Sequence, residues 1–177
     1  MSKKVFILPG LYNSGPDHWQ TYWESEHGFE RINQDNWETP VKDEWIKRID
    51  ETVTKFPLGN VVLIGHSLAC STVAWWAAKY NRKIHGALLV GPSDTECDIY
   101  PPGTSGFMPM PLNQIPFRTI IIASTNDEYV SVARAQQFAK AWGSELVMAG
   151  ALGHINSASK LESWEFGYNV LKNLIES

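Results

Sequence analysis

The sequence predicts an α/β fold: a doubly wound, mostly parallel sheet of about six strands in a three-layer arrangement. Strand-length apolar runs alternate with runs of helical periodicity along the chain. Such alternation requires right-handed crossovers, which place the strands parallel and put helices on both faces of the sheet. At residues 60–70 an apolar strand also passes through a sharp turn into an alanine-rich helix. The length of 177 residues suits a single domain over residues 1–177.

The first part of the chain is expected to form two strands and two helices. The apolar run at Lys4–Leu8 is typical of a short buried strand, which Pro9 and Gly10 end. Ser14 or Asp17 could cap the helix that follows. The expected elements are a strand at residues 4–8, a helix at residues 18–26, a half-buried strand at residues 29–33 and a helix at residues 44–56.

Residues 60–70 form the centre of the predicted fold. The apolar run stops at Gly65, Ser67 follows, and a helix to about Tyr80 begins at once. A strand, a sharp turn with serine at its apex and a helix are typical of a nucleophile elbow. Gly65 and Ala69 supply the small residues that this turn needs on both sides. On this stretch alone, the alternative is a serine that caps a helix.

The second half of the chain continues the alternation. Residues 91–117 contain six prolines and are expected to be irregular, and a loop of this length is usually functional or mobile. Within it, residues 107–111 could form the rim or lid of an acyl pocket, or a small apolar cluster under the loop. The expected elements are a helix at residues 68–80, strands at residues 84–90 and 118–123, a helix at residues 130–142, a strand at residues 145–148 and a closing helix at residues 157–175.

Composition argues against several classes of protein. The formal net charge is −4 and no basic cluster is visible, so nucleic-acid binding has no electrostatic support. The apolar runs are strand-sized, which predicts no membrane span. The N-terminus lacks the features of a secretory signal, so we expect a cytoplasmic protein. We expect neither a metal nor a cofactor, and no protein partner is identified by the sequence.

Candidate catalytic partners for Ser67 follow two later strand ends. In doubly wound sheets, ligands bind at the carboxyl ends of the strands. Asp127 and His154 follow the last two expected strands, which reproduces the Ser, Asp, His order of the α/β-hydrolase triad. His154 would act as general base, and Asp127 would orient its imidazole. Asp94 also follows a strand end, but Asp127 is favoured because its strand-to-helix turn is tighter.

The same edge of the sheet supplies candidates for oxyanion binding and for the pocket wall. The backbone N–H of Leu68 directly follows the nucleophile, and that of Leu11 lies in the loop after the first strand. Tyr12 is a candidate for contact with substrate. His18 and Trp19 begin the helix beside this loop and could either line the site or hold the loop in place.

With these residues in view, the chain resembles the small α/β-hydrolase family that includes retinoblastoma-binding protein 9 and the bacterial YdeN-type serine hydrolases. The similarity covers nearly the whole chain. The resemblance implies a compact hydrolase without a large cap domain and a triad on Ser67, Asp127 and His154, but no particular substrate. The matching segments are residues 9–11, residues 18–20 with Trp23, residues 65–67, residues 124–127 and residues 150–156.

Three positions depart from the pattern of this family. Ala69 replaces the glycine common at the end of the elbow motif and is small enough to preserve activity. Glu128 stands where proline often follows the aspartate, and its carboxylate could raise the histidine pKa or face solvent. Thr72 replaces the acidic residue of the retinoblastoma-binding L-x-C-x-E pattern, so we do not expect that partner.

The sequence therefore predicts a serine hydrolase that forms an acyl-enzyme at Ser67 and acts on small carboxylic esters or related acyl substrates. Its pocket should be shallow and bounded by Leu11, Tyr12 and residues 91–117. The alternative is a catalytically idle α/β-hydrolase fold that binds a protein through Trp75, Trp76 or the proline-rich loop. A binding module has no need for serine, aspartate and histidine at three strand ends.

Overall fold

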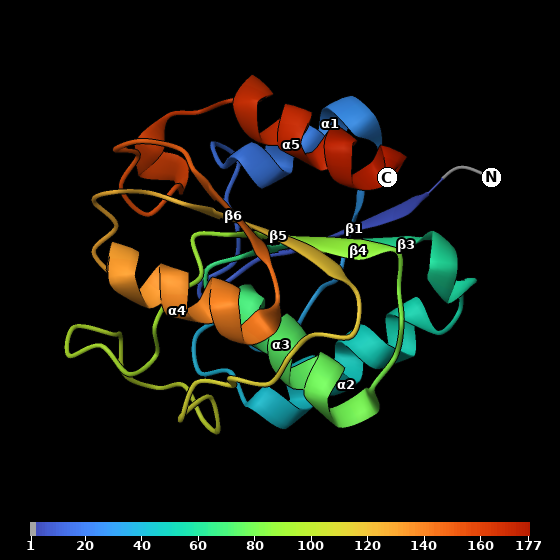
Figure 1. Ribbon diagram of the computed structural model, residues 1–177, viewed down its shortest axis with the longest axis horizontal. Coiled ribbons are helices and arrows are strands. Elements are labelled where there is room, and N and C mark those ends of the chain that lie inside the picture. Colours follow the sequence, from blue (N-terminus) through green and yellow to red (C-terminus); the bar gives the residue numbers. More distant parts are fainter. Residues whose placement is uncertain (1–2) are drawn as a thin grey trace.

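A computed structural model describes residues 3–177 and contains one six-stranded sheet (Figure 1). The strand order is β2-β1-β3-β4-β5-β6, and every neighbouring pair is parallel. The strands are β1 (Lys4–Leu8), β2 (Glu30–Arg31), β3 (Val61–His66), β4 (Gly86–Val90), β5 (Arg118–Ala123) and β6 (Glu145–Met148). The predicted doubly wound α/β architecture is confirmed, with β2 shorter than expected.

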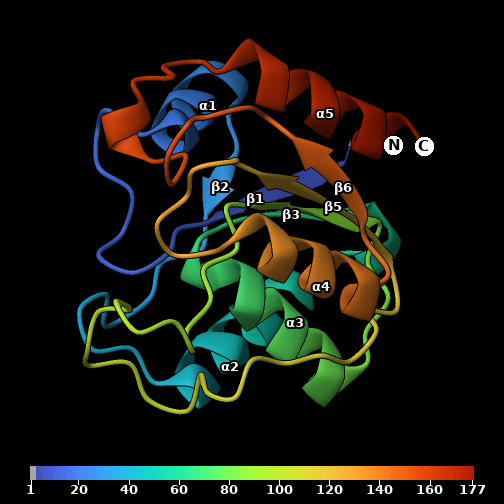
Figure 2. The same cartoon turned by 60° about the vertical axis from the view of Figure 1, so that its left-hand side comes forward.

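Helices cover both faces of the sheet (Figure 2). On one face lie α1 (Trp19–His27) and α5 (Glu165–Glu176), and on the other lie α2 (Lys42–Val53), α3 (Leu68–Tyr80) and α4 (Val132–Trp142). Side chains alternate along each strand, so that Leu63 enters one core and Ile64 the other. Within residues 3–177, no helix has the length and apolar character needed to cross a membrane.

The start of α1 differs from the prediction. Its cap is His18, whose Nδ1 accepts a hydrogen bond from the backbone N–H of Gln20 at 3.1 Å. Asp17 is exposed, and the Ser14 hydroxyl donates instead to the Gln20 side chain at 2.7 Å. The imidazole of His18 thus caps the helix in place of the expected serine or aspartate.

The prediction of one closing helix over residues 157–175 is wrong. A short 3-10 turn at Ser157–Ser159 is followed by an irregular segment, and α5 begins only at Glu165. Lys160, Glu162 and Trp164 have φ values of 52°, 50° and 39°, which an α-helix cannot contain. The turn at Trp164 buries its indole against Trp19, with ring centroids 5.2 Å apart. Burial of a large aromatic side chain against the core therefore outweighs local helical preference.

Residues 91–117 connect β4 to β5 and are irregular, as predicted, apart from one bridge between Val41 and Ser105. Their first turn is held to α4 by Arg134, which pairs with Asp94 at 2.8 Å and also with Glu96. Phe107 is buried and joins Trp45 and Leu68 in a small apolar cluster. Of the two alternatives for residues 107–111, the structure thus favours the apolar cluster over a pocket rim.

Candidate active site

Ser67 lies in the sharp turn between β3 and α3, with φ 57° and ψ −121°. This conformation is costly for a residue other than glycine, and such strain is usually found at functional sites. The turn depends on close packing by small residues. A Cβ on Gly10 would lie 2.8 Å from both the His66 carbonyl oxygen and Ser67 Cβ. A Cβ on Gly65 would lie 3.3 Å from the backbone of Ala69. The missing side chain of Gly10 therefore lets the loop after β1 approach the turn, and that of Gly65 lets α3 begin close to β3.

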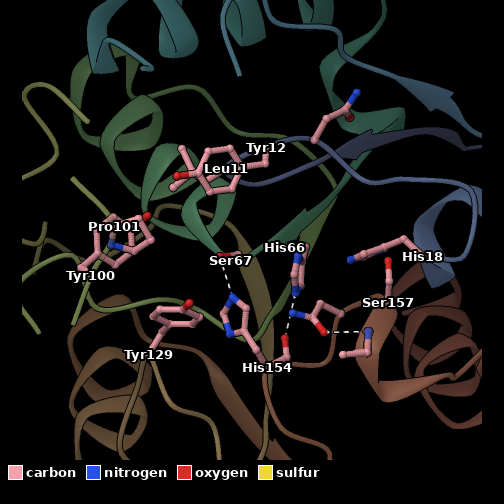
Figure 3. Close-up of a pocket in the computed structure, with 13 residues that line it drawn as sticks. Leu11, Tyr12, His18, His66, Ser67, Tyr100, Pro101, Tyr129, His154 and Ser157 are labelled. Atoms are coloured by element: carbon pink, nitrogen blue, oxygen red, sulfur yellow. Dashed lines mark hydrogen bonds between the residues drawn. The ribbon is translucent and has the colours of Figure 1, made fainter. Parts of the chain in front are cut away.

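The structure brings Ser67, His154 and Asp127 into one hydrogen-bonded chain, and Figure 3 shows the contact between Ser67 and His154. Ser67 Oγ lies 2.8 Å from His154 Nε2, and His154 Nδ1 lies 2.9 Å from each carboxylate oxygen of Asp127. The Asp127 side chain is fully buried, and 7% of the His154 side chain is exposed. A serine, an imidazole and a buried carboxylate in this order are the components of a nucleophile with its base and an orienting acid.

The rival carboxylate, Asp94, contacts Arg134 rather than His154. The backbone N–H of Tyr129 donates to Asp127 Oδ1 at 2.9 Å and helps to fix that carboxylate toward the imidazole. Glu128, next in sequence, is exposed to solvent. The two aspartates, each just beyond a strand end, therefore have separate partners.

Polar side chains after β5 hold the loop that carries His154. Asn126 Oδ1 accepts from the backbone N–H of Gly153 at 2.8 Å, and Ser124 Oγ accepts from that of Leu152 at 2.9 Å. On the other side, His66 Nε2 donates to the His154 carbonyl oxygen at 3.0 Å. The segment at residues 124–127 thus provides both the carboxylate and the braces for the histidine loop.

Ser93 is a site residue that the sequence analysis did not identify. Its hydroxyl lies 3.1 Å from Ser67 Oγ, and 1% of the residue is exposed. Ser93 follows the end of β4, so the rule that led to Asp127 and His154 could also have found it. At this distance it can hydrogen-bond to the Ser67 hydroxyl in competition with His154.

The two candidate oxyanion donors lie close to the Ser67 turn. Leu68 is the first residue of α3, and Leu11 follows Gly10, which packs directly on the turn. Within residues 3–177, neither the Leu68 nor the Leu11 N–H is engaged in a hydrogen bond, whereas the Tyr12 N–H donates to the Trp37 carbonyl at 2.9 Å. Both N–H groups are thus available to a ligand.

A cavity of about 280 Å³ opens beside Ser67 and His154. Leu11, Tyr12 and His18 line it. Trp19 does not: it is 1% exposed, and its Nε1 donates to the Ile155 carbonyl at 2.8 Å. Of the two roles considered for Trp19, the structure therefore contradicts substrate contact, because the indole supports the histidine loop from within the core.

The histidines that surround the site are held in their neutral forms. Burial lowers the pKa of His18 to about 3, with further contributions from Arg31 and His154. Burial also lowers the pKa of His66 to well below 6.5. Among residues 3–177 no group of three metal-ligating side chains comes together.

Comparison with known proteins gives one family and a large set of similar structures. Residues 5–173 match the family described as serine hydrolase. No curated protein matches the sequence.

Three solved structures illustrate the structural similarity. A protein of Pectobacterium atrosepticum described as a YdeN-like hydrolase is 30% identical, with a TM-score of 0.85 over 99% of this chain and 91% of its own. The ydeN gene product of Bacillus subtilis is 19% identical, with a TM-score of 0.80 over 99% and 100%. A monoacylglycerol lipase of Paleococcus ferrophilus shares the fold at 13% identity, with a TM-score of 0.72 over 99% and 96%.

Proposed function

Because this chain belongs to the serine hydrolase family, we propose that it hydrolyses small carboxylic esters through an acyl-enzyme formed on Ser67. The observation that carries this proposal is the continuous hydrogen-bonded chain from Ser67 through His154 to Asp127. Each of the three residues comes from the carboxyl end of a different strand, where substrates bind in folds of this class.

In the first half of the reaction, His154 Nε2 takes the proton of the Ser67 hydroxyl as the oxygen attacks the ester carbonyl. Asp127 keeps the other ring proton on Nδ1, so that Nε2 is free to accept, and stabilises the imidazolium that forms. The C–O bond to the alcohol then breaks, and His154 returns the proton to that oxygen. A water molecule repeats the sequence on the acyl-enzyme and releases the acid.

The negative charge of the tetrahedral intermediate would be held by the backbone N–H groups of Leu68 and Leu11. Neither N–H group donates a hydrogen bond to another group within residues 3–177. Leu68 is also at the N-terminus of α3, where the helix dipole favours negative charge. Preorganised donors of this kind contribute about 2.7–4 kcal/mol each in comparable enzymes.

The size of the cavity supports a small substrate. About 280 Å³ is just below the usual range of ligand pockets, which measure roughly 300–1,000 Å³. Its outer wall is formed by Tyr12, which is 59% exposed, and by Tyr100 and Pro101 from the irregular segment. A long acyl chain would extend past these residues into solvent.

The first test is labelling by a fluorophosphonate probe followed by intact-mass measurement. Wild-type protein should gain one adduct, and Ser67→Ala should gain none. Ser93→Ala is the matched control because it removes a hydroxyl only 3.1 Å away, and it should still be labelled. An adduct that survives Ser67→Ala but disappears in Ser93→Ala would assign the nucleophile to Ser93, and no adduct on folded wild type would contradict the proposal.

The two tryptophans give little support to the alternative of an idle protein-binding fold. Trp76 is fully buried and donates to Asp50 Oδ1 at 3.1 Å. Trp75 is half-buried, with Lys42 Nζ 4.2 Å from its ring centroid. Neither indole is presented as an exposed anchor for a partner.

A further inference from the structure

Two polar groups that line the cavity are buried and unpaired. Among the described residues, His18 Nε2 and the Tyr100 hydroxyl are buried without a hydrogen-bond partner, and both residues line the cavity beside Ser67. In Figure 3 the two residues lie on opposite sides of Ser67. Buried polar groups are nearly always paired, so an exception in a cavity suggests that a ligand supplies the partner.

The hydrogen bonding of His18 determines which of its nitrogens carries the proton. Nδ1 accepts from the backbone N–H of Gln20, so it has no proton of its own. The ring is neutral because its pKa is lowered to about 3. A neutral imidazole has one N–H, which must then be on Nε2. His18, 3% exposed, therefore presents a fixed N–H donor at the cavity.

Tyr100 presents a second neutral donor. Burial raises the pKa of its hydroxyl, and the nearby Ser93 side chain lowers it by a smaller amount. The geometry between Tyr100 and Ser93 is not that of a hydrogen bond, so the Tyr100 hydroxyl has no partner among the described residues. The cavity wall contains no lysine, arginine, aspartate or glutamate among the described residues. Two of the imidazoles in the lining, those of His18 and His66, are neutral. The lining therefore offers donors without a formal charge.

We propose that His18 is a specificity residue that selects uncharged esters carrying a hydrogen-bond-accepting oxygen, such as a carbonyl, ether or hydroxyl oxygen, in the part of the molecule that reaches its Nε2. This inference rests on the proposed esterase function and narrows its substrate class. A purely alkyl group would leave the His18 N–H buried and unpaired. An anion would enter a cavity whose walls hold no cation to compensate its lost hydration.

The test uses p-nitrophenyl esters with acyl groups of equal length. Pentanoate is the alkyl reference, and ethoxyacetate and β-methoxypropanoate each replace one methylene by an ether oxygen. β-Sulfopropanoate adds acceptor oxygens together with a negative charge. Taking the ratio of kcat/KM for each ester to that for pentanoate, and comparing this ratio between variants, cancels differences in intrinsic reactivity.

His18→Ser removes the imidazole while keeping a side chain that can cap α1. Its ratio for the better ether ester should fall by about three- to tenfold, the effect of losing one neutral hydrogen bond. Ser131→Ala is the matched control, because Ser131 caps α4, is exposed and does not line the cavity. It should keep the wild-type ratios. The sulfonate ester should be the poorest substrate of wild type.

Binding separates this inference from the proposed function. Ser67→Ala should bind the intact ether ester more tightly than the pentanoate, and the ¹⁵N resonance of His18 Nε2 should shift more with the ether ester. This measurement also serves if His18→Ser does not fold. If the ether ester binds more tightly than the pentanoate but wild type hydrolyses neither, the esterase proposal is overturned and the role of His18 is not. Turnover with equal ratios in wild type and His18→Ser, or a preference for the sulfonate, would overturn the role of His18 alone.

Discussion

Replacing Asp127 by asparagine should abolish most of the esterase activity while leaving the fold intact. In the native site both carboxylate oxygens lie 2.9 Å from His154 Nδ1, so whichever oxygen accepts, the ring proton stays on Nδ1. The Tyr129 N–H, 2.9 Å from Oδ1, should keep the amide oxygen of the asparagine at that position. The amide nitrogen would then face Nδ1 and offer it a proton.

This rearrangement favours the wrong tautomer of His154. With its proton moved to Nε2, the ring can no longer accept the proton of Ser67, which lies 2.8 Å away. The expected loss in kcat is about 10⁴-fold, the scale known for a misheld catalytic histidine, which corresponds to about 5.5 kcal/mol of barrier.

Asp94→Asn is the matched control, since it makes the same chemical change at another strand end. It weakens a hydrogen-bonded ion pair with Arg134 and should cost about 1–3 kcal/mol of stability. Its kcat should stay within about tenfold of wild type because Asp94 does not contact His154. Hydrolysis of p-nitrophenyl butanoate and urea unfolding of both variants would check this. A larger loss of kcat in Asp94→Asn than in Asp127→Asn would refute the assignment.

Three further predictions concern folding and the geometry of the turn. His18 and His66 both have lowered pKa values, so the unfolded chain binds more protons below pH 6.5. The free energy of unfolding should therefore fall on acidification, by about 2 kcal/mol in urea titrations between pH 6.5 and 5.5, and a flat profile would contradict their burial as neutral rings. Gly10→Ala should reduce kcat by at least about 10²-fold and cost about 1–3 kcal/mol of stability, since the new methyl group would overlap the Ser67 turn and displace the oxyanion loop; full activity would show that this loop tolerates movement. Gly167→Ala would overlap the buried indole of Trp164 and should cost about 1–3 kcal/mol in urea unfolding, whereas unchanged stability would mean that the indole can move aside.

The sequence was sufficient to place most of the elements and to predict Ser67, Asp127 and His154, which the structure brings together. Alternating apolar runs determine the strands and helices, and parallel strands necessarily end at one edge of the sheet. Ser67, Asp127 and His154 could therefore be expected to lie near one another although 87 residues separate the first from the last. The turn at Ser67 was also predictable, because Gly65 and Ala69, the small residues on either side of it, are local in sequence.

Contacts between distant segments decided the rest. Arg134 on α4 forms an ion pair with Asp94, so Asp127 is the carboxylate that contacts His154. The closing helix is interrupted where Trp164 packs into a core formed with α1. The N–H of His18 is unpaired because Nδ1 accepts the hydrogen bond that caps α1, while Nε2 lies at the cavity. Local periodicity carries no information on such contacts, since they depend on which side chains three-dimensional packing brings together.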